Sequence, residues 1–230
     1  MTAPIELFYW PTPNGWKISI YLEEAGVAYN VNYVNILAGD QFKPEFLKIS
    51  PNNRMPAIID RDGPGGAPIS IFESGAILQY LGRKTGKFYP ADERARAEVD
   101  EWLMWQMSAV GPMLGQLHHF ANYAPEKVDY AITRYADEAH RLYGVLNGRL
   151  EGRAYVAGDY SIADMAIFSW TRLWERHRID AAEFPHFKRW LDLVAARPAV
   201  ARGLALGADK RGNIADNEAA RKILFGQRAR

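Results

Sequence analysis

The stretch "IELFYWPTPNGWKISIYLEEAGVAYNVNYV", residues 5–34, decides the fold of the first third of the chain. Its apolar start, "IELFYW", predicts a buried strand, and its end, "YNVNYV", alternates apolar and polar residues as a second strand does. Between them, residues 14–26 predict a helix with one apolar face and with Gly26 as its C-cap. A strand, a helix and a strand within about thirty residues favour a parallel βαβ unit.

The following residues extend this unit with shorter elements. A short helix, a strand led by proline, a second strand after the turn "RDGPGGAP", and a closing helix are predicted at 42–50, 55–60, 69–72 and 74–86. The predicted order is therefore βαβ–α–ββα, an α/β domain.

Beyond a polar linker at 83–96, the pattern becomes helical. Apolar residues recur every three or four positions, which predicts helices over 98–118, 125–151, 160–177 and 184–198, the last stopped at Pro198. Ser161 and Asp164 form the Ser-x-x-Asp pattern of a capping box. Because each apolar stripe needs a partner helix, the second half predicts an all-α domain.

These patterns divide the chain into three parts. We expect an α/β domain over 1–87, an all-helical domain over 93–208 and a polar tail over 209–230. The tail is locally basic, and its segment "NEAARKILFGQ" predicts either a short helix or a mobile end.

Bulk composition excludes several kinds of partner and chemistry. The 230 residues carry a formal net charge of +1, so we expect neither a nucleic-acid-binding nor an anionic-membrane-binding protein. There is no basic signal-peptide region and no apolar run near ~18 residues, so we expect a cytoplasmic protein with no membrane partner. The absence of cysteine excludes disulfides, thiolate metal ligands and a protein thiol nucleophile.

The turn between the first strand and helix is the first candidate site. Thr12 before Pro13 fits an N-cap with proline at the first helical position, which leaves Asn14 in the first turn. Backbone N–H groups and the positive end of the helix dipole favour an anion there, and Thr12 and Asn14 add two donors. From the turn alone, a plain capped helix start is the commoner interpretation.

Two further loops carry candidate residues. In "NNRMPAI", a cis Met55–Pro56 bond would turn the Met55 main chain outward toward a bound peptide, although trans is the expectation from sequence alone. In "FESGAI", Ser74 can cap the next helix, whose amides would bind a carboxylate, while Glu73 can pair with an ammonium group. Together Glu73 and Ser74 suit an amino-acid head group, but an isolated pair of this kind is more often a helix cap beside a solvated acid.

Other candidates carry less chemistry. His118 and His119 are adjacent, so a helix would aim them about 100° apart, which makes them poor metal co-ligands. The Trp and Met residues of 102–113 suit a core or interface. Neither a Gly-x-Gly-x-x-Gly nor a Walker pattern occurs. We expect no metal.

The three loops, in this order and ahead of a helical half, resemble the glutathione transferase family. The resemblance covers residues 5 to about 206, and "SPNNRMPAIID", "FESGAILQYL" and "YSIADMAIFSW" carry most of it. Within the family, "PTPNGWKISIYLEE", "GDQFKPEFLKISPNN" and "GPMLGQLHHF" are similar to the bacterial nu class, which includes glutathione-dependent disulfide-bond reductases. The resemblance implies a thioredoxin-like N-terminal domain with a cis-Pro56, an all-α C-terminal domain and a homodimer.

The resemblance also implies residue roles and glutathione, reduced or oxidised, as cosubstrate. Thr12 and Asn14 would donate to its sulfur, where most other classes have a Tyr, Ser or Cys. The Met55 main chain would pair with the cysteinyl unit, and Glu73 and Ser74 would hold the γ-glutamyl head. Gln41 and Arg54 would bind the glycyl end or a second glutathione. Arg134 is a candidate for binding an acidic group of that second molecule. Tyr9, inside the strand, is expected in the core.

The function predicted in this way is disulfide-bond reduction through bound glutathione thiolate, with peroxide reduction as a further activity. Two alternatives stay open: a conventional transferase that conjugates glutathione to small-molecule electrophiles, and a non-catalytic glutathione-binding protein. Two or three charge-assisted donors at a helix N-terminus would supply the roughly 2.7 kcal/mol needed to lower a thiol pKa by about two units.

Overall fold

The computed structural model describes residues 4–212 and 217–227. These residues divide into two compact units: one holds the described residues up to Tyr80 together with those from Arg202 onward, and the other holds Leu81–Ala201. None of the helices within the described ranges has the length and apolar character that crossing a bilayer requires.

Within the described residues, the first unit is built on a four-stranded mixed sheet. Strands β1 (Ile5–Tyr9), β2 (Tyr29–Tyr33), β3 (Ala57–Asp60) and β4 (Ile69–Phe72) lie in the order β2-β1-β3-β4. β1 is parallel to β2 and antiparallel to β3, and β3 is antiparallel to β4. The predicted βαβ–α–ββα order is confirmed.

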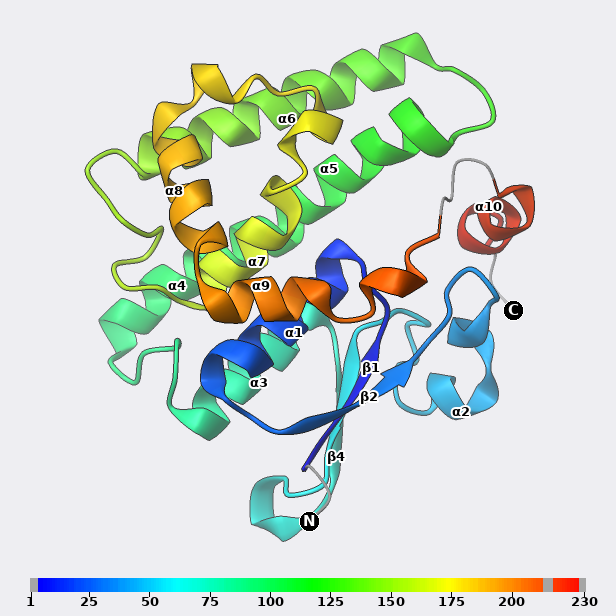
Figure 1. Ribbon diagram of the computed structural model, residues 1–230, viewed down its shortest axis with the longest axis vertical. Helices are drawn as coiled ribbons and strands as arrows, with labels where there is room; N and C mark the ends of the chain where they lie inside the picture. Colours follow the sequence, from blue (N-terminus) through cyan, green and yellow to red (C-terminus); the bar gives the residue numbers. More distant parts are fainter. Residues whose placement is uncertain (1–3, 213–216, 228–230) are drawn as a thin grey trace. The chain divides into compact units, whose positions relative to one another are not determined.

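Helices cover both faces of this sheet (Figure 1). α1 (Pro13–Ala25) packs against the β1 face that carries Tyr9, and α2 (Pro44–Leu47) packs on the opposite face. α3 (Ser74–Thr85) follows β4. Gly26 ends α1 in the left-handed conformation, with φ of 67°, as predicted.

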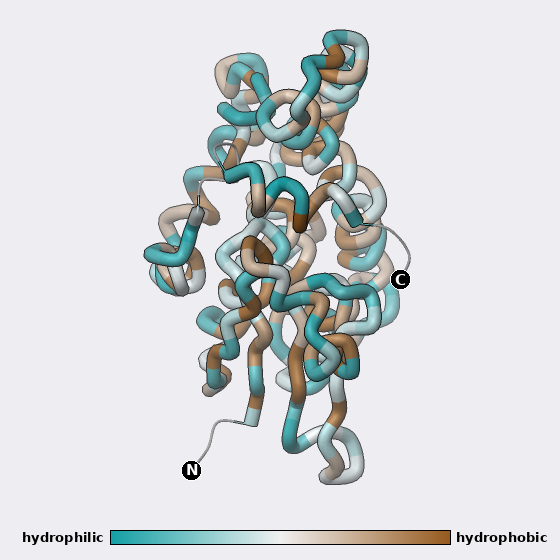
Figure 2. The backbone as a smooth tube through the Cα atoms, turned by 90° about the vertical axis from the view of Figure 1, so that its right-hand side faces the viewer, coloured by the Kyte–Doolittle hydropathy of each residue, from teal (hydrophilic) through white to brown (hydrophobic). Residues whose placement is uncertain are grey.

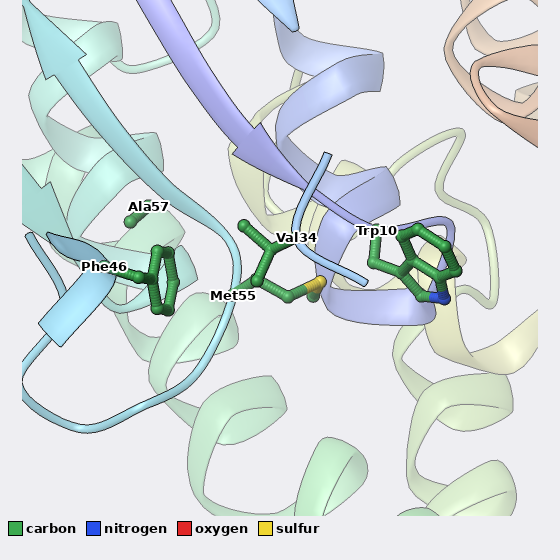
Figure 3. Close-up of a cluster of buried hydrophobic side chains, with 5 residues drawn as sticks. All are labelled: Trp10, Val34, Phe46, Met55 and Ala57. Atoms are coloured by element: carbon green, nitrogen blue, oxygen red, sulfur yellow. The ribbon is translucent and has the colours of Figure 1, made fainter. Parts of the chain in front are cut away.

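Under α2 lies a small hydrophobic cluster that reaches the candidate site. It consists of Trp10, Val34, Phe46, Met55 and Ala57. Figure 3 shows the Met55 side chain between Phe46 and Trp10, with its sulfur turned to the Trp10 side. The Met55 side chain is therefore fixed by core packing, while the Met55 main chain is part of the loop before Pro56.

The chain returns to the first unit after the helical one. The Ser19 hydroxyl donates to the Gly203 carbonyl at 2.7 Å, and a Cβ at Gly203 would lie 2.7 Å from the Ile20 backbone, so only glycine fits this contact. The Arg211 guanidinium lies over the Trp16 ring, 4.7 Å from its centroid.

The second unit consists of helices, along most of which hydrophilic and hydrophobic residues alternate in Figure 2. Its α-helices include α4 (Glu93–Trp105), α5 (Gly111–His118), α6 (Asp129–Arg149), α7 (Ile162–Thr171) and α8 (Pro185–Ala195). α7 is buried along nearly its whole length and contacts α4, α5 and α8. The predicted capping box is present: Ser161 accepts from the Ala163 N–H, and Asp164 accepts from the Ser161 N–H.

Two helix boundaries differ from the predictions, and the tail contains a helix. The helix predicted over 98–118 begins at Glu93, inside the expected linker, and passes through a π-helical segment at Gln106–Val110. Pro198 does not stop α8, which ends at Ala195; instead it begins α9 (Pro198–Ala205), because proline suits a first helical position. In the tail, α10 (Glu218–Phe225) forms with an Asn217 cap, so the helical alternative is confirmed there.

Candidate functional site

The first loop of the site is the turn that begins α1. Thr12 has extended backbone angles and its hydroxyl accepts a hydrogen bond of 3.4 Å from the Gly15 N–H, so the predicted N-cap is confirmed. Gly15 lies so close to β1 that a Cβ would be 2.3 Å from the Trp10 carbonyl. This close approach fixes the helix N-terminus, with its outward N–H groups, against the end of the strand.

The second loop contacts the first. Thr12 Oγ1 lies 3.7 Å from the sulfur of Met55, which is itself nine-tenths buried. The Met55–Pro56 peptide bond is cis, so the resemblance predicted its geometry correctly, whereas the expectation from sequence alone was wrong. The Ser50 hydroxyl donates to the Arg54 carbonyl at 2.8 Å and closes this loop on itself.

The third loop contacts the second loop and helix α1. Asn52 donates from Nδ2 to Glu73 Oε1 at 3.0 Å, which joins the second loop to the third. Lys17 Nζ, on α1, lies 3.2 Å from Ser74 Oγ. Ser74 is the first residue of α3, so Glu73 occupies the capping position that the sequence had assigned to Ser74. The first unit thus brings together Thr12, Met55, Glu73 and Ser74, which are distant in the sequence.

Two residues of these loops have unusual backbone angles. Asn53 has φ of 48° and Glu73 has φ of 67°, in the left-handed region that non-glycine residues seldom adopt. Such conformations cost on the order of 1–3 kcal/mol and cluster at ligand-binding sites. Their presence in both loops indicates that the positions of Asn52, Arg54 and Ser74 are maintained at some cost in stability.

Asn14 lies where the sequence placed it, in the first turn of α1, and is half-buried. It follows the capping Thr12 by two residues, at the end of the helix where backbone N–H groups point outward. Its role toward a sulfur atom stays a prediction.

Gln41 and Arg54 differ in their surroundings. Gln41 is 1% exposed, and its Nε2 donates to the Ile36 carbonyl at 3.2 Å, while its Oε1 is buried with no hydrogen-bond partner among the described residues. Arg54 is exposed, and its Nη1 donates to Gln227 Oε1 at 3.0 Å, so the segment after α10 contacts a predicted ligand residue. That contact was not anticipated from the sequence.

Arg134 lies in the second unit, on α6, and is exposed. It is 3.8 Å from Glu138, one turn along the helix, and Glu138 also accepts two hydrogen bonds from Arg141. This is a common surface arrangement, and the role of Arg134 toward a second ligand stays a prediction.

Sequence reasoning also missed Lys17. It sits within "GWKISIYL", and every residue of Gly15–Leu22 is buried. The available signal was a charged residue inside an apolar stretch of the sequence. The apolar spacing around it does not show which group the lysine contacts.

The two adjacent histidines belong to the second unit. His118 is buried and stacks on His177 with ring centroids 4.7 Å apart, while His119 is half-exposed. Tyr143 donates to the Thr171 carbonyl at 3.1 Å and lies 2.7 Å from His177 Nδ1, so the neutral tautomer with its proton on Nδ1 fits. The described residues contain no group of three or more potential His, Cys, Asp or Glu metal ligands.

Tyr9 is fully buried, as expected of a core residue. Its hydroxyl donates to the Leu206 carbonyl at 3.2 Å, and burial raises its pKa to about 12. Tyr9 therefore stays a neutral phenol at physiological pH, and no catalytic tyrosinate is available from this position.

The fold and the three-loop site define the class of protein. The family model for the glutathione S-transferase N-terminal domain matches residues 3–83, and that for the C-terminal domain matches residues 112–198. The chain belongs to the glutathione S-transferase family, with a thioredoxin-like N-terminal unit and a helical C-terminal unit.

Two similar proteins have names more specific than that of the family. The disulfide-bond oxidoreductase YfcG of Escherichia coli (strain K12) is 50% identical over 202 residues, which are 87% of this chain and 94% of that protein. The disulfide-bond oxidoreductase YghU of the same strain is 41% identical over 214 residues, covering 87% of this chain and 74% of that protein.

A solved glutathione transferase from Burkholderia graminis, with two glutathione molecules bound per subunit, has a TM-score of 0.86 and 46% identity, covering 91% of this chain and 90% of its own.

Proposed function

We propose that this chain is a glutathione-dependent disulfide-bond reductase that works through the thiolate of bound glutathione. One observation carries the proposal: a capped helix N-terminus, with Thr12 beside the Met55–Pro56 loop, offers hydrogen-bond donors in a chain that contains no cysteine. The donors suit an anionic sulfur, and the sulfur must come from the ligand. The 50% identity to a disulfide-bond oxidoreductase supports the same activity.

Different site residues would bind different parts of the glutathione tripeptide. Thr12 and Asn14 donate to the sulfur, the Met55 main chain beside Pro56 pairs with the cysteinyl unit, and Glu73 and Ser74 hold the ammonium and carboxylate of the γ-glutamyl head. The charges fit, because Glu73 is an exposed acid and Ser74 lies at a helix N-terminus. Gln41 and the exposed Arg54 are assigned to the glycyl end or a second glutathione, and the Arg54 guanidinium suits a carboxylate there.

The reaction needs two thiol–disulfide exchanges. The first glutathione thiolate attacks one sulfur of the substrate disulfide, so that a mixed disulfide forms and the other substrate sulfur leaves as a thiolate. A second glutathione thiolate then attacks the glutathione sulfur of the mixed disulfide, releasing the remaining substrate thiolate and leaving glutathione disulfide. Two glutathiones lose the two electrons that the substrate disulfide gains, and no protein thiol takes part.

The protein's part is to stabilise the thiolate. A free thiol with a pKa of about 8.5 is only a few per cent ionised at neutral pH. Lowering this pKa by about two units takes roughly 2.7 kcal/mol of preferential stabilisation, and hydrogen bonds to charged groups contribute about 1.5–3 kcal/mol each. Thr12, Asn14 and the N-terminus of α1 together reach this magnitude.

Parallel assays test the function. Purified protein with glutathione should reduce 2-hydroxyethyl disulfide, and the variant Thr12→Ala should lose most of that activity. Conjugation of a chloroaromatic electrophile at a higher rate than disulfide reduction would instead identify a conventional transferase. Tight glutathione binding without turnover in either assay would identify a non-catalytic binding protein.

We also propose peroxide reduction as a second activity, a homodimeric state and a cytoplasmic location. The thiolate that attacks a disulfide can also attack a peroxide, which an assay with cumene hydroperoxide measures. Sedimentation should give twice the 26.0 kDa chain mass. The cytoplasm supplies the reducing glutathione pool that the reaction consumes.

A further inference from the structure

Lys17 is a charged residue in the interior of the first unit. Its side chain is 1% exposed, and its neighbours Trp16 and Ile18 on α1 are also buried. Removing an ammonium group from water is unfavourable unless another group compensates. The position therefore calls for a partner near the Lys17 side chain.

That partner lies in the third loop of the site. Lys17 Nζ is 3.2 Å from Ser74 Oγ, and Ser74 is 4% exposed at the first position of α3. An ammonium group only donates, so the Ser74 oxygen accepts and its own proton is directed elsewhere. A serine held in this way is oriented to donate to an incoming carboxylate.

Burial and one nearby carboxylate act on Lys17 in opposite directions. Burial lowers the pKa of Lys17 to about 7, and the Glu73 carboxylate on the neighbouring loop acts in the opposite direction. Glu73 is exposed and accepts a hydrogen bond from Asn52. A second negative charge near Ser74 would stabilise the ammonium form further.

We propose that Lys17 is a positioning residue of the carboxylate subsite: it orients Ser74 from within the core and takes up one proton from solvent when an amino-acid carboxylate binds at Ser74 and the N-terminus of α3. This inference rests on the proposed function, because the carboxylate is that of the γ-glutamyl head of glutathione. The protein amine gains the proton, the bound carboxylate stays ionised, and no covalent bond changes.

The proposal gives the affinity a defined pH dependence. Below about pH 7 Lys17 already carries its proton, so binding takes up little. Above about pH 7 binding must draw a proton from solvent, so the affinity falls as pH rises, by up to about tenfold per pH unit.

The probe must not titrate at its sulfur, since ionisation of the glutathione thiol would release a proton and mask the uptake. S-methylglutathione keeps the γ-glutamyl head and blocks the thiol. Isothermal titration at about pH 7 and about pH 8, in buffers of low and high ionisation enthalpy, measures protons taken up per ligand bound. We expect about half a proton near pH 7 and close to one near pH 8 for the unaltered protein.

Three variants complete the test. Lys17→Met should lower the affinity at least tenfold near pH 7 and abolish proton uptake, and Lys17→Arg should restore much of the affinity without uptake, because arginine stays charged. Lys48→Met removes an exposed lysine of the same unit and should match the unaltered protein in both measurements. Thermal unfolding shows which variants are folded.

Two results would overturn the inference while leaving the proposed function intact. One is binding by the unaltered protein with no proton uptake at either pH; the other is Lys17→Met with unaltered affinity and uptake. Failure of the unaltered protein to bind S-methylglutathione and glutathione at all would instead overturn the proposed function, and this inference with it.

Discussion

Asn52 donates a hydrogen bond of 3.0 Å from Nδ2 to Glu73 Oε1, and so ties the loop before Pro56 to the start of α3. Both ends of this contact lie next to strained backbone: Asn53 has φ of 48°, and Glu73 itself has φ of 67°. The acidic residue proposed to hold the ligand's ammonium group is thus oriented by a neighbouring loop.

Removal of this contact should weaken glutathione binding. In Asn52→Ala, Glu73 loses its oriented position, and we expect a rise of about threefold to tenfold in the dissociation constant, equivalent to about 1 kcal/mol. Titration calorimetry measures it. Asn30→Ala is the matched control, since Asn30 also donates to a glutamate, Glu6, on the exposed sheet surface. Equal affinities in the two variants would contradict the orienting role of Asn52.

Asn14→Ala should change the bound thiol more than the binding. Loss of one donor to the sulfur raises the pKa of bound glutathione by about one unit, because one charge-assisted hydrogen bond is lost. Disulfide exchange near neutral pH slows accordingly, while the dissociation constant rises little. Thiolate absorbance followed against pH gives the pKa directly, and an unchanged titration curve removes Asn14 from the mechanism.

Ser74→Ala should do the reverse. It removes a donor to the γ-glutamyl carboxylate, so binding weakens by about tenfold or more, as expected for a hydrogen bond to a charged group. The thiol pKa of the glutathione that does bind should stay near its value in the unaltered protein. An unaltered dissociation constant would count against the head-group assignment.

The buried histidine pair should make the second unit sensitive to acid. Burial lowers the pKa of His118 to about 4 and that of His177 well below 6.5. Below about pH 6.5 these two histidines therefore bind protons in the unfolded chain but not in the folded chain. The free energy of unfolding decreases as pH falls from about 6.5 toward 4. His118→Phe, which keeps an aromatic ring beside His177, should reduce the loss between about pH 7 and 5 by about 1–2 kcal/mol.

Denaturant unfolding at several pH values checks this difference. Burial also raises the pKa of Asp164 to about 6, which acts with the opposite sign on stability, so variants must be compared at each pH. His186→Gln, at a half-exposed position on α8, controls for loss of a histidine. Parallel pH profiles for His118→Phe and the unaltered protein would show that the buried pair does not govern acid stability.

Much of the fold followed from the sequence because its signals are local. Alternation and apolar runs located the strands, Thr12 and Pro13 located the start of α1, and the Ser161–Asp164 pattern located α7. Pro198 shows the limit of such signals, since proline disfavours a helix interior but favours a first turn. Which of the two applied depended on contacts that the local pattern does not contain.

The loops of the candidate site could be predicted from the sequence, but the side-chain contacts of these loops with distant residues could not. Thr12, Met55 and Ser74 each carried a motif, but the contact of Lys17 with Ser74 spans 57 residues. The contact of Arg54 with Gln227 spans 173 residues. Both depend on how the chain closes in three dimensions, and periodicity holds no information on pairs so far apart.

The Ser19–Gly203 contact has a consequence for how this protein is made on the ribosome. When the first 80 residues have emerged, the surface of α1 around Ile20 still lacks the backbone that covers it, because that backbone is synthesised more than a hundred residues later. The first unit can complete its packing only near the end of translation. A gene fragment encoding the first half alone would therefore yield a less stable product, and truncations beyond Ala201 would impair the opposite end of the sequence.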